Sequence, residues 1–591
     1  MKKIILTAIN AKYIHSNPAV YSLKAYANQY GQLGDIEIEI ANYTINQQPA
    51  EIIADLYQRR PEVVAISCYI WNIDVVYILL KELKKVLPSV DIWLGGPEVS
   101  FDACRLMQKW PAIKGIILGE GEQTFLELAK FYQGTGTLGE IAGIVYRSGQ
   151  GEIVQNEQRA LIDLTKIPFL YHNPGEFENR IIYYESSRGC PFRCSYCLSS
   201  IDKTVRLRDI DLVKKELAFF IAQKVSQVKF IDRTFNCNKA HAKEIWNYIL
   251  EHDNGITNFH FEVAADLLSE EELAILNRFR PGAVQLEIGV QSTNPQTIQE
   301  IDRVMNVEKL SSIVARIHEG NNVHIHLDLI VGLPHEDYTS FGKSFDDVFR
   351  MHPQQLQLGF LKVLKGSKMH QKAKDYGLLY TDDAPYEVLC TNDISYAEIL
   401  RLKQIEEMVE LFYNSNQFRT TLAALTLEFE RPFAMFEALA DFYEERGYYI
   451  QTPARSYRYH VLLEFVKTHF AEKTAYYKEL LTRDLYLREN AKTRPDFAPD
   501  MSAYKDVMRQ FYRDQMANHD ILSAYEQYDA RQMARMTHIE VFAYDADLSQ
   551  PAAEPDYVLF DYMRRNPLTY EAETIVLKRC GNTLVKRDDH E

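Results

Sequence analysis

Three cysteines lie close together in the stretch Cys190-Pro-Phe-Arg-Cys194-Ser-Tyr-Cys197. They directly follow an apolar, strand-like run and a glycine, which places them on one short loop. Three thiolates on one loop can converge on a single metal site. The other five cysteines stand alone, which is typical of ordinary buried residues: Cys68, Cys104, Cys237, Cys390 and Cys580.

The composition of this loop argues against a structural zinc site. A closed zinc site needs four Cys or His ligands, and no histidine lies near the three cysteines in the sequence. Iron–sulfur ligation by three cysteines would instead leave one iron free to bind a substrate or cofactor. Three inert thiols, or a zinc completed by a distant ligand, are the alternatives, and the spacing favours iron.

The cysteine pattern also indicates a reducing compartment. A secreted disulfide framework would spread its cysteines in pairs through a small domain. The N-terminal stretch MKKIILTAINAKY has two lysines before a short apolar run but no small-residue cleavage site, so a buried first strand is the better prediction. No run of 18 apolar residues exists. We therefore expect a cytoplasmic protein with no membrane partner.

The motif resembles the signature of the radical S-adenosylmethionine superfamily, CxxxCxφC, with Tyr196 at the aromatic position φ. The resemblance implies a catalytic four-iron four-sulfur cluster held by Cys190, Cys194 and Cys197. Its open iron would chelate the amino and carboxylate groups of S-adenosylmethionine, and Tyr196 would contact the adenine. One electron, from a donor such as flavodoxin or ferredoxin, would then release a 5′-deoxyadenosyl radical.

The elements that must position these cysteines lie in residues 181–375. Strand-like runs alternate there with helical stretches at 181–190, 227–235, 258–268, 283–292, 323–334 and 355–364. This order predicts a partial (β/α)6 barrel of the TIM type, with chemistry at the carboxyl ends of its strands.

Polar side chains stand at several of these strand ends. The resemblance implies that they bind S-adenosylmethionine: Asp232, Glu262, Glu287, Gln291 and Asp328. Each acidic residue alone could be an ion-pair partner inside the barrel, or a carboxylate that caps a strand end. Their placement at successive strand ends favours a ligand site.

Residues 1–145 show a second alternation of strands and helices. Strand-like runs occupy 3–9, 36–43, 63–71, 91–96 and 115–122, with helical patterns such as 18–31 and 73–87 between them. The pattern predicts a Rossmann-like, doubly wound parallel sheet, which binds ligands beyond the carboxyl ends of its strands.

Three motifs follow strands of this first domain: Ser67, the run Gly95-Gly96-Pro97-Glu98, and the run Gly119-Glu120-Gly121-Glu122. Glycines let the backbone approach a bulky ligand, and a serine hydroxyl can hydrogen-bond a buried base or phosphate. The region resembles the cobalamin-binding domain that precedes the radical domain in one large subfamily. That resemblance implies cobalamin contacts from Ser67, Gly95, Gly96, Glu98, Gly119 and Glu120. The alternative is a Rossmann-like domain without its ligand.

Two departures from related families narrow the prediction. The DxHxxG motif that ligates cobalt in cobalamin mutases is absent, and His15 in the first loop is better read as a surface or supporting residue than as a cobalt ligand. Radical methylthiotransferases hold a second cluster on three N-terminal cysteines, whereas only Cys68 and Cys104 occur in that region here. Mutase chemistry and a second cluster are therefore not expected.

The remaining segments carry less information. Residues 146–180 hold prolines and polar residues without a sustained period, which predicts a linker. Residues 376–591 show helical spacing of Tyr, Phe, Leu, Glu and Arg, with strand-like runs at 541–548, 556–565 and 572–580. We expect a mainly helical C-terminal domain whose aromatic residues form its core. It resembles the uncharacterised domain of one cobalamin-type radical branch.

The composition of the chain excludes some classes of protein. The chain has 591 residues, 46% of them hydrophobic and 25% charged, so disorder as the main state is excluded. Lys plus Arg is 66 and Asp plus Glu is 82, which gives 66 − 82 = −16. A chain this acidic lacks the overall basic charge of a general nucleic-acid binder, although a local basic patch remains compatible with it.

We therefore predict a cobalamin-dependent radical S-adenosylmethionine enzyme that methylates an unactivated carbon of a substrate that the sequence leaves open. The first alternative uses the same cofactors for oxidative cyclisation or rearrangement without methyl transfer. The second is a non-catalytic cobalamin or iron sensor, which the lack of a convincing DNA- or RNA-reading motif disfavours.

Overall fold

The structure is a computed structural model that describes residues 2–544 and 551–587. The chain divides into two compact units. The first holds Met1–Phe341 and Gly359–Ile399, and the second holds Gly342–Leu358 and Leu400–Glu591. The limits expected above for the individual domains stay predictions.

The N-terminal part of the first unit is built on a seven-stranded sheet of order β2-β1-β3-β4-β5-β6-β7. Neighbours from β2 to β5 pair in parallel, whereas β6 and β7 add antiparallel strands at one edge. The strands are β1 Lys2–Asn10, β2 Ile36–Thr44, β3 Val63–Ser67, β4 Asp91–Gly95, β5 Ile113–Ile117, β6 Ile144–Arg147 and β7 Ile153–Gln155. Strand β7 lies in the stretch expected as a linker and instead extends the sheet.

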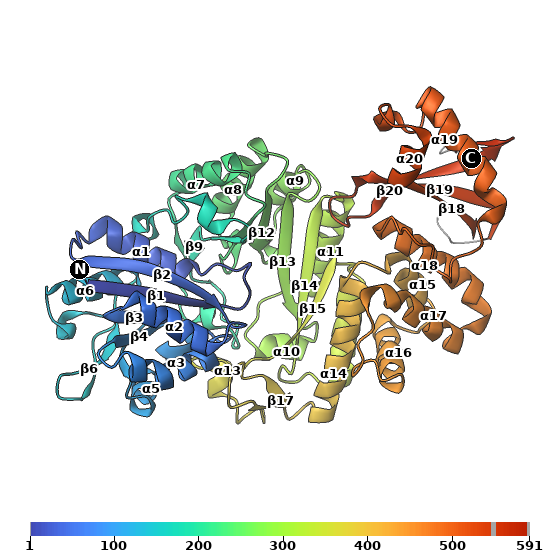
Figure 1. The fold of residues 1–591 in the computed structure, drawn as a ribbon. Helices are drawn as coiled ribbons and strands as arrows, with labels where there is room; N and C mark the ends of the chain where they lie inside the picture. Colours follow the sequence, from blue (N-terminus) through green and yellow to red (C-terminus); the bar gives the residue numbers. More distant parts are fainter. Residues whose placement is uncertain (1, 545–550, 588–591) are drawn as a thin grey trace. The chain divides into compact units, whose positions relative to one another are not determined.

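Alternating side chains of β1 enter two different hydrophobic cores, as the period of a strand requires. Ile4, Leu6 and Ala8 pack with residues of α1 and α6, whereas Ile5 and Ile9 pack with α2, α3 and α5. The helices are α1 Pro18–Tyr30, α2 Pro49–Arg59, α3 Ile73–Val86, α4 Pro97–Ser100, α5 Ala103–Lys109 and α6 Glu122–Gln133. Helices on both faces give the doubly wound architecture that the sequence predicted (Figure 1).

The central part is a six-stranded sheet of order β15-β14-β13-β12-β11-β8, drawn from green to yellow in Figure 1. Its strands are β8 Ile182–Tyr184, β11 Gln227–Phe230, β12 Asn258–Glu262, β13 Val284–Gln291, β14 Val323–Val331 and β15 Gln355–Phe360. All six fall within the predicted runs, and sequential order is that of an open (β/α)6 barrel. The helices between them are α7 Ile210–Ala222, α8 Lys239–Glu251, α9 Glu270–Leu276, α10 Pro295–Glu300, α11 Val307–Glu319 and α12 Tyr338–Phe349.

Short elements complete the first unit. Strands β9 Ser187–Arg188 and β10 Arg206–Leu207 form an antiparallel pair on either side of the three cysteines. After β15 come α13 Lys368–Gln371, β16 Leu379–Tyr380 and β17 Val388–Cys390. The cysteine loop is therefore held at both of its ends by one small ribbon.

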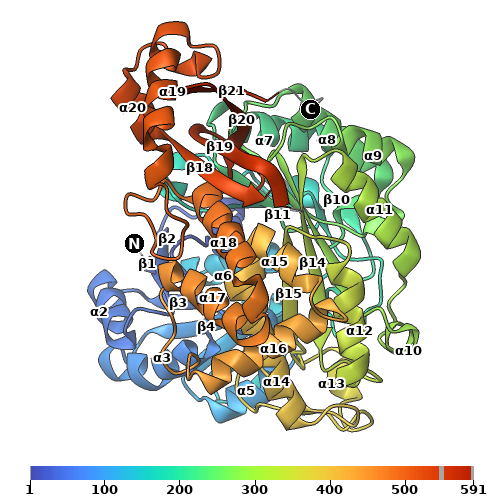
Figure 2. The same ribbon diagram turned by 90° about the vertical axis from the view of Figure 1, so that its right-hand side faces the viewer.

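The second unit combines helices with one antiparallel sheet of order β18-β19-β20-β21 (Figure 2). The helices are α14 Tyr396–Met408, a π-helix Val409–Asn414, α15 Arg419–Thr426, α16 Pro432–Glu445, α17 Arg458–His469, α18 Thr474–Arg488, α19 Lys505–Asn518 and α20 Ala530–Met536. The strands are β18 Thr537–Tyr544, β19 Pro551–Arg565, β20 Ala572–Cys580 and β21 Thr583–Lys586.

The predicted mainly helical character of the C-terminal region is confirmed, and so is its terminal sheet. Residues 545–548 of the expected strand 541–548 lie outside the described residues. Among the residues that the structure describes, no helix is both long and apolar enough to cross a membrane.

Candidate functional site

The three cysteines of the motif lie on one loop with free thiols. Cys190 and Cys194 are buried, at 8% and 7% exposure, and Cys197 is half-buried. Gly189 precedes the loop with φ +92°, and a Cβ there would lie 2.3 Å from the carbonyl oxygen of Thr204. Only glycine fits this position, so the strand β9 can turn directly into the cysteine loop.

A half-buried arginine contacts the second cysteine. Arg303 lies 3.7 Å from the Cys194 sulfur through Nη1 and donates to the Tyr196 hydroxyl at 3.3 Å. Its Nη2 donates to the backbone carbonyl of Gly289 at the end of β13. Burial alone would lower the pKa of Arg303, yet the neighbouring Tyr196 and Cys194 groups raise it. The guanidinium therefore stays charged beside the cysteine loop.

A second polar side chain, that of Gln291, lies beside Gly289. Its Nε2 atom lies 2.2 Å from where a Cβ on Gly289 would stand, so a side chain at residue 289 would displace it. Its Oε1 atom is buried without a hydrogen-bond partner among the described residues. A buried acceptor without a partner costs free energy and marks a place where a ligand donor would fit. Of the predicted S-adenosylmethionine contacts, Tyr196 and Gln291 are thus brought together near Cys194.

Asp232 holds the strand end that leads into the cysteine loop. Its carboxylate accepts from the Ser186 backbone N–H at 2.9 Å and from the hydroxyls of Ser186 and Ser187 at 2.6 Å each. The side chain is 1% exposed, and burial raises the pKa of Asp232. The carboxylate is thus engaged by protein donors, and its expected role toward S-adenosylmethionine stays a prediction.

Two other predicted carboxylates are engaged inside the barrel. Glu287 forms an ion pair of 2.9 Å with Lys229, and its carboxylate also lies 2.9 Å from Nε2 of His260, whose pKa is lowered by burial. Burial opposes its ionisation, yet these two partners hold the pKa of Glu287 far below its usual range. Asp328 lies 3.1 Å from His326. Both acids have the ion-pair partners that the sequence left open as the alternative, and their ligand roles stay predictions.

Glu262 differs from these acids. It ends β12, opposite Glu287 in the parallel register. Burial raises its pKa to about 7, although the nearby charges of Arg233 and Lys229 oppose this rise more than Glu287 and Asp328 add to it. A carboxyl group with a pKa this close to neutrality can exchange a proton under ordinary conditions, which is common at functional sites.

One cavity of about 580 Å³ is lined by both the first domain and the barrel. The first domain contributes the ends of β3, β4 and β5 with their following loops, and the barrel contributes β8, β9 and the end of β11. The lining includes five residues predicted for cobalamin, which lie in three loop regions: Ser67, Gly95 with Gly96, and Gly119 with Glu120. This volume lies in the usual range for ligand pockets.

Gly96 and Gly119 have different structural roles at this cavity. Gly96 has φ +109°, and a Cβ there would lie 2.5 Å from the Cys68 carbonyl oxygen. Gly119 has φ +65°, and a Cβ there would meet no atom within 4 Å. The first glycine permits close approach of two strand ends, and the second leaves open space beside the cavity. Ser67 accepts a hydrogen bond from Asn17 at 2.5 Å.

Glu98, also predicted as a cobalamin contact, is not among the residues that line this cavity. Its carboxylate accepts a short hydrogen bond from Tyr386 and lies 3.4 Å from Lys365. Lys365 also donates to the Tyr386 hydroxyl at 3.0 Å. In this structure, Glu98 joins the first domain to the segment that follows the barrel. Its cobalamin role stays a prediction.

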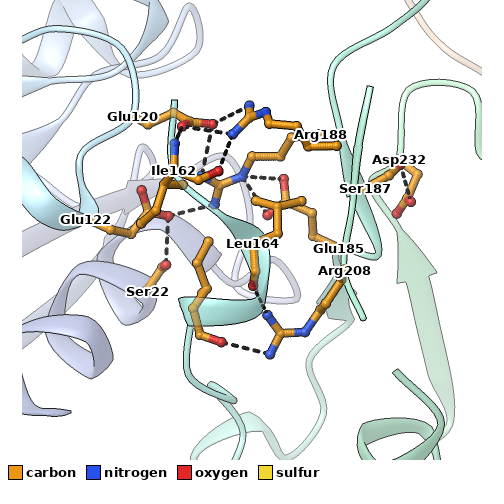
Figure 3. A network of polar contacts seen from close by, with 12 residues as sticks. Ser22, Glu120, Glu122, Ile162, Leu164, Glu185, Ser187, Arg188, Arg208 and Asp232 are labelled. Atoms are coloured by element: carbon orange, nitrogen blue, oxygen red, sulfur yellow. Dashed lines mark hydrogen bonds and ion pairs between the residues drawn. The ribbon is translucent and has the colours of Figure 1, made fainter. Parts of the chain in front are cut away.

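An arginine network connects the glycine-rich loop to the cysteine loop (Figure 3). Arg188 of β9 contacts Glu122 at 2.6 Å, Glu185 at 2.9 Å and Glu120 at 3.3 Å. Glu122 also accepts from the Ser22 hydroxyl at 2.9 Å. Burial alone would raise the pKa of Glu122, but the Arg188 charge holds it below its usual value. Arg188 stands two positions before Cys190, so one side chain bridges both loops.

Two further arginines extend this network to the segment between the domains. Arg206 pairs with Glu120 at 2.7 Å, and Arg208 pairs with Glu216 at 2.5 Å. Their guanidinium groups also donate to the backbone carbonyls of residues 162, 164 and 167 (Figure 3). Glu120 is therefore neutralised by two arginines while it lines the cavity.

The residues present fit the cofactors that the sequence resemblance implies. Thiolates on one loop are the usual ligands of iron–sulfur clusters, and three of them leave one iron open. The cavity combines open space beside Gly119 with glycine positions at strand ends, as a bulky planar ligand requires. The half-buried side chains of Gln291 and Arg303 supply polar groups beside the cysteine loop.

Sequence reasoning missed Arg188, Arg303 and the pair Lys365–Tyr386. Arg188 lies two positions before Cys190 in the sequence, but nothing in the run IIYYESSRGC indicates its partners. Arg303 lies more than 100 positions after Cys194, and no local signal indicates it either. Long-range partners of this kind depend on the fold and not on local pattern.

Family models match three successive parts of the chain. A model of the B12 binding domain matches residues 4–129, and one of the radical SAM superfamily matches residues 184–348. A model of a protein family of unknown function, DUF4080, matches residues 374–560. These three regions correspond in order to the domains that the sequence predicted.

Curated relatives are distant. The chain is 23% identical over 378 residues to the cobalamin-dependent radical SAM methyltransferase TokK of Streptomyces tokunonensis, covering 56% of this chain and 52% of that protein. It is 23% identical over 273 residues to the anaerobic magnesium-protoporphyrin IX monomethyl ester cyclase of Rubrivivax gelatinosus, covering 44% and 48%. The chain spans about half the length of these two relatives.

Among solved structures, the cobalamin-dependent S-adenosylmethionine radical enzyme OxsB, with aqua-cobalamin and S-adenosylmethionine bound, shares the fold. The TM-score is 0.56 at 15% sequence identity, and the match covers 82% of this chain and 78% of that chain.

Proposed function

We propose that this chain, a member of the cobalamin-binding radical S-adenosylmethionine family, is an enzyme that methylates an unactivated carbon. Its cofactors are a 4Fe-4S cluster, S-adenosylmethionine and cobalamin. The observation that carries the proposal is the cavity that the first domain and the barrel line together, next to the cysteine loop. Two cofactors that must act on one carbon need such a shared space.

When bound, the cofactors would supply the radical chemistry that removes a hydrogen atom from the substrate carbon and the methyl group that replaces it. The chain positions them. Cys190, Cys194 and Cys197 would hold the cluster, with Arg303 keeping a positive charge beside Cys194. Tyr196 and Gln291 would contact S-adenosylmethionine.

Further contacts complete the proposed site. The loops at Ser67, Gly95, Gly96 and Gly119 would support cobalamin, with Glu120 held in place by Arg206. Glu262 would provide a carboxyl group that can hold or release a proton at its Oε atoms near neutral pH. An electron donor of the flavodoxin or ferredoxin type would supply the electron.

A second candidate function uses the same site for oxidative cyclisation or rearrangement. It is favoured by the similarity to the magnesium-protoporphyrin cyclase, whereas the similarity to TokK favours methyl transfer. The two reactions differ in product mass. Methylation adds one carbon and two hydrogens to the substrate, and oxidative cyclisation removes two hydrogens.

The first test is anaerobic reconstitution of the full chain with iron, sulfide and cobalamin. We expect about four irons and one cobalt per chain, and dithionite-dependent formation of 5′-deoxyadenosine. Cys194→Ala should lose iron and 5′-deoxyadenosine together. Cys580→Ala, at an exposed cysteine outside the loop, is the matched control and should keep both.

The outcomes separate the alternatives. Iron without cobalt would refute methyl transfer and leave a radical enzyme whose first domain has another role. Neither metal after reconstitution would refute the whole proposal. With an extract of small molecules as the substrate source, a deuterated methyl group of S-adenosylmethionine in the product supports methylation, and a product lighter by two hydrogens supports cyclisation.

A further inference from the structure

A groove of about 1000 Å³ lies in the second unit, and none of its lining residues belongs to the proposed site. Its walls come from helices α15 and α18 and from the strands β19 and β20 with their connecting turn, elements labelled in Figure 2. Four of its lining residues are arginines: Arg419, Arg483, Arg564 and Arg565. Two are glutamates: Glu571 and Glu573.

The charge of this groove opposes that of the chain. Four arginines and two glutamates give its lining a formal charge of +2, whereas the whole chain carries −16. Arg419 pairs with Glu571 at 2.9 Å, but Arg564 lies 3.9 Å from Glu573, at the limit of an ion pair. Arg565 donates to the backbone carbonyls of Arg488 and Tyr570, which do not neutralise it.

A fifth arginine is not part of the lining but contacts it, because its backbone carbonyl accepts from Arg565. Arg488, at the end of α18, donates to the backbone carbonyl of Thr569. Burial and the nearby charges of Arg455 and Arg565 lower the pKa of Arg488, with Glu571 only partly opposing them. Several guanidinium groups are thus gathered at and beside this groove, and their charges would stabilise a bound anion.

The donors for an anion would be guanidinium groups and not a helix end. The first backbone N–H groups of α15, at Thr420 and Thr421, already donate to the Asp484 carboxylate at 2.9 Å each. Arginine forks match the oxygen geometry of phosphate and bind it with two parallel hydrogen bonds. Arg419 and Arg564 are 59% and 50% exposed, so they are accessible to such a ligand.

The rest of the lining indicates what the phosphate is attached to. The groove is much larger than a phosphate ion, and Ala423, Leu487 and Met563 add apolar surface to it. Among the described residues, none that lines it is aromatic, so they offer no stacking platform of the kind that single-stranded nucleic acids use. We propose that this groove binds the phosphate group of a small organic phosphate ester, whose apolar part lies against α15 and α18.

The test is calorimetric titration of the full chain with phenyl phosphate, inorganic phosphate and benzoate. We expect saturable binding in the order phenyl phosphate, then phosphate, then benzoate, weakened by salt. Arg419→Gln combined with Arg564→Gln should weaken phenyl phosphate at least tenfold. Arg509→Gln, an exposed arginine of α19 in the same unit, is the matched control and should bind unchanged.

A second variant separates binding from folding. Glu573→Gln removes a carboxylate that is 52% exposed and leaves every arginine in place. We expect it to strengthen phenyl phosphate binding about two- to threefold, a gain that an unfolding defect cannot produce.

Other outcomes would overturn the proposal. Benzoate binding as tightly as phenyl phosphate would remove the preference for phosphate. A decathymidylate bound more tightly than phenyl phosphate, and lost in the same double variant, would assign the groove to a nucleic acid. Equal weakening by Arg509→Gln would show that only general charge matters. None of these results depends on iron or cobalt content, so they are independent of the proposed enzymatic function.

Discussion

A guanidinium group beside a thiol stabilises negative charge that develops on the sulfur. Arg303 is such a group, held by the Gly289 carbonyl and directed at Cys194 and Tyr196. Because Arg303 lies far from Cys194 in the sequence, no motif spacing could predict this contact. Hydrogen bonds and positive charge near the sulfurs of an iron–sulfur cluster stabilise its reduced form and raise its potential.

Replacing Arg303 should therefore shift the cluster potential. In Arg303→Gln we expect a midpoint on the order of 50 mV more negative, because one charged donor to sulfur is lost. A redox titration followed by electron paramagnetic resonance measures this directly. Arg303→Lys keeps the positive charge, so its midpoint should lie closer to that of the unaltered chain. An unchanged or more positive midpoint in Arg303→Gln would contradict this role.

Glu262 predicts a pH dependence of stability. Its pKa is raised to about 7 in the folded chain by burial, so the native state keeps a proton that the unfolded state has already lost. The native state then binds more protons between the ordinary glutamate pKa and pH 7, and stability falls as pH rises through this window. A shift of this size is worth on the order of 3 kcal/mol.

Glu262→Gln cannot ionise and should escape this loss. We expect its thermal midpoint, relative to the unaltered chain, to rise between pH 5 and pH 8. The matched control is Glu270→Gln, whose exposed carboxylate has a pKa lowered by Arg316 and is already ionised across this range. Its difference from the unaltered chain should stay flat. A flat difference for Glu262→Gln would show that the carboxyl group is ionised at pH 5.

At the scale of elements, the local sequence pattern is sufficient to predict a strand wherever its buried residues recur periodically. The alternation of Ile4, Leu6 and Ala8 with Ile5 and Ile9 specifies a strand between two cores, and the structure places them so. The six barrel strands were found for the same reason. Strand β7 was missed because its three residues, Ile153–Gln155, have no fully buried side chain and pair only at a sheet edge.

For the candidate site, the sequence could supply residue types but not their partners. The cysteines and the glycine-rich loops could be recognised from spacing alone. That Glu287 faces Lys229 and His260, or that Glu98 faces Tyr386, follows from strand register and from contacts between segments far apart in the chain. Such contacts leave no local signature, since any buried carboxylate looks the same in a sequence.

One residue of β9, Arg188, forms the ion pairs that link this strand to the glycine-rich loop. Arg188→Gln would leave the carboxylates of Glu120, Glu122 and Glu185 without their shared cation. Removing one member of a buried ion-pair cluster typically costs about 3–5 kcal/mol. We expect a loss of that size in the free energy of unfolding of the first unit, with faster hydrogen exchange at residues 119–122 and 186–190.

The matched control is a solvent-exposed ion pair. Arg316→Gln breaks a pair with Glu270 whose side chains are 41% and 79% exposed. It should cost less than about 1 kcal/mol and leave exchange in both loops unchanged. If Arg188→Gln had no larger effect than Arg316→Gln, the two loops would be held together by other contacts.

At the scale of the whole molecule, the chain passes more than once between its two compact units. Residues 342–358 belong to the second unit although they precede the end of the first. Within that unit the Phe345 ring lies 5.4 Å from that of Phe433 and 5.5 Å from that of Phe436. The Phe433 backbone N–H donates to Asp346 at 2.8 Å. Helix α12 is thus covered by α16.

A chain that ends at residue 375, the limit expected from the sequence, would lack α16 and leave this face of α12 open. Exposed aromatic surface of this kind promotes association. We therefore expect the truncated chain to bind a hydrophobic dye and to elute as aggregates, whereas the full chain does neither. Replacing Phe345 and Phe349 by serine in the truncated chain should reduce both effects, because these rings cause them. A truncated chain that is monomeric and unfolds cooperatively would show that the radical domain is complete without the C-terminal region.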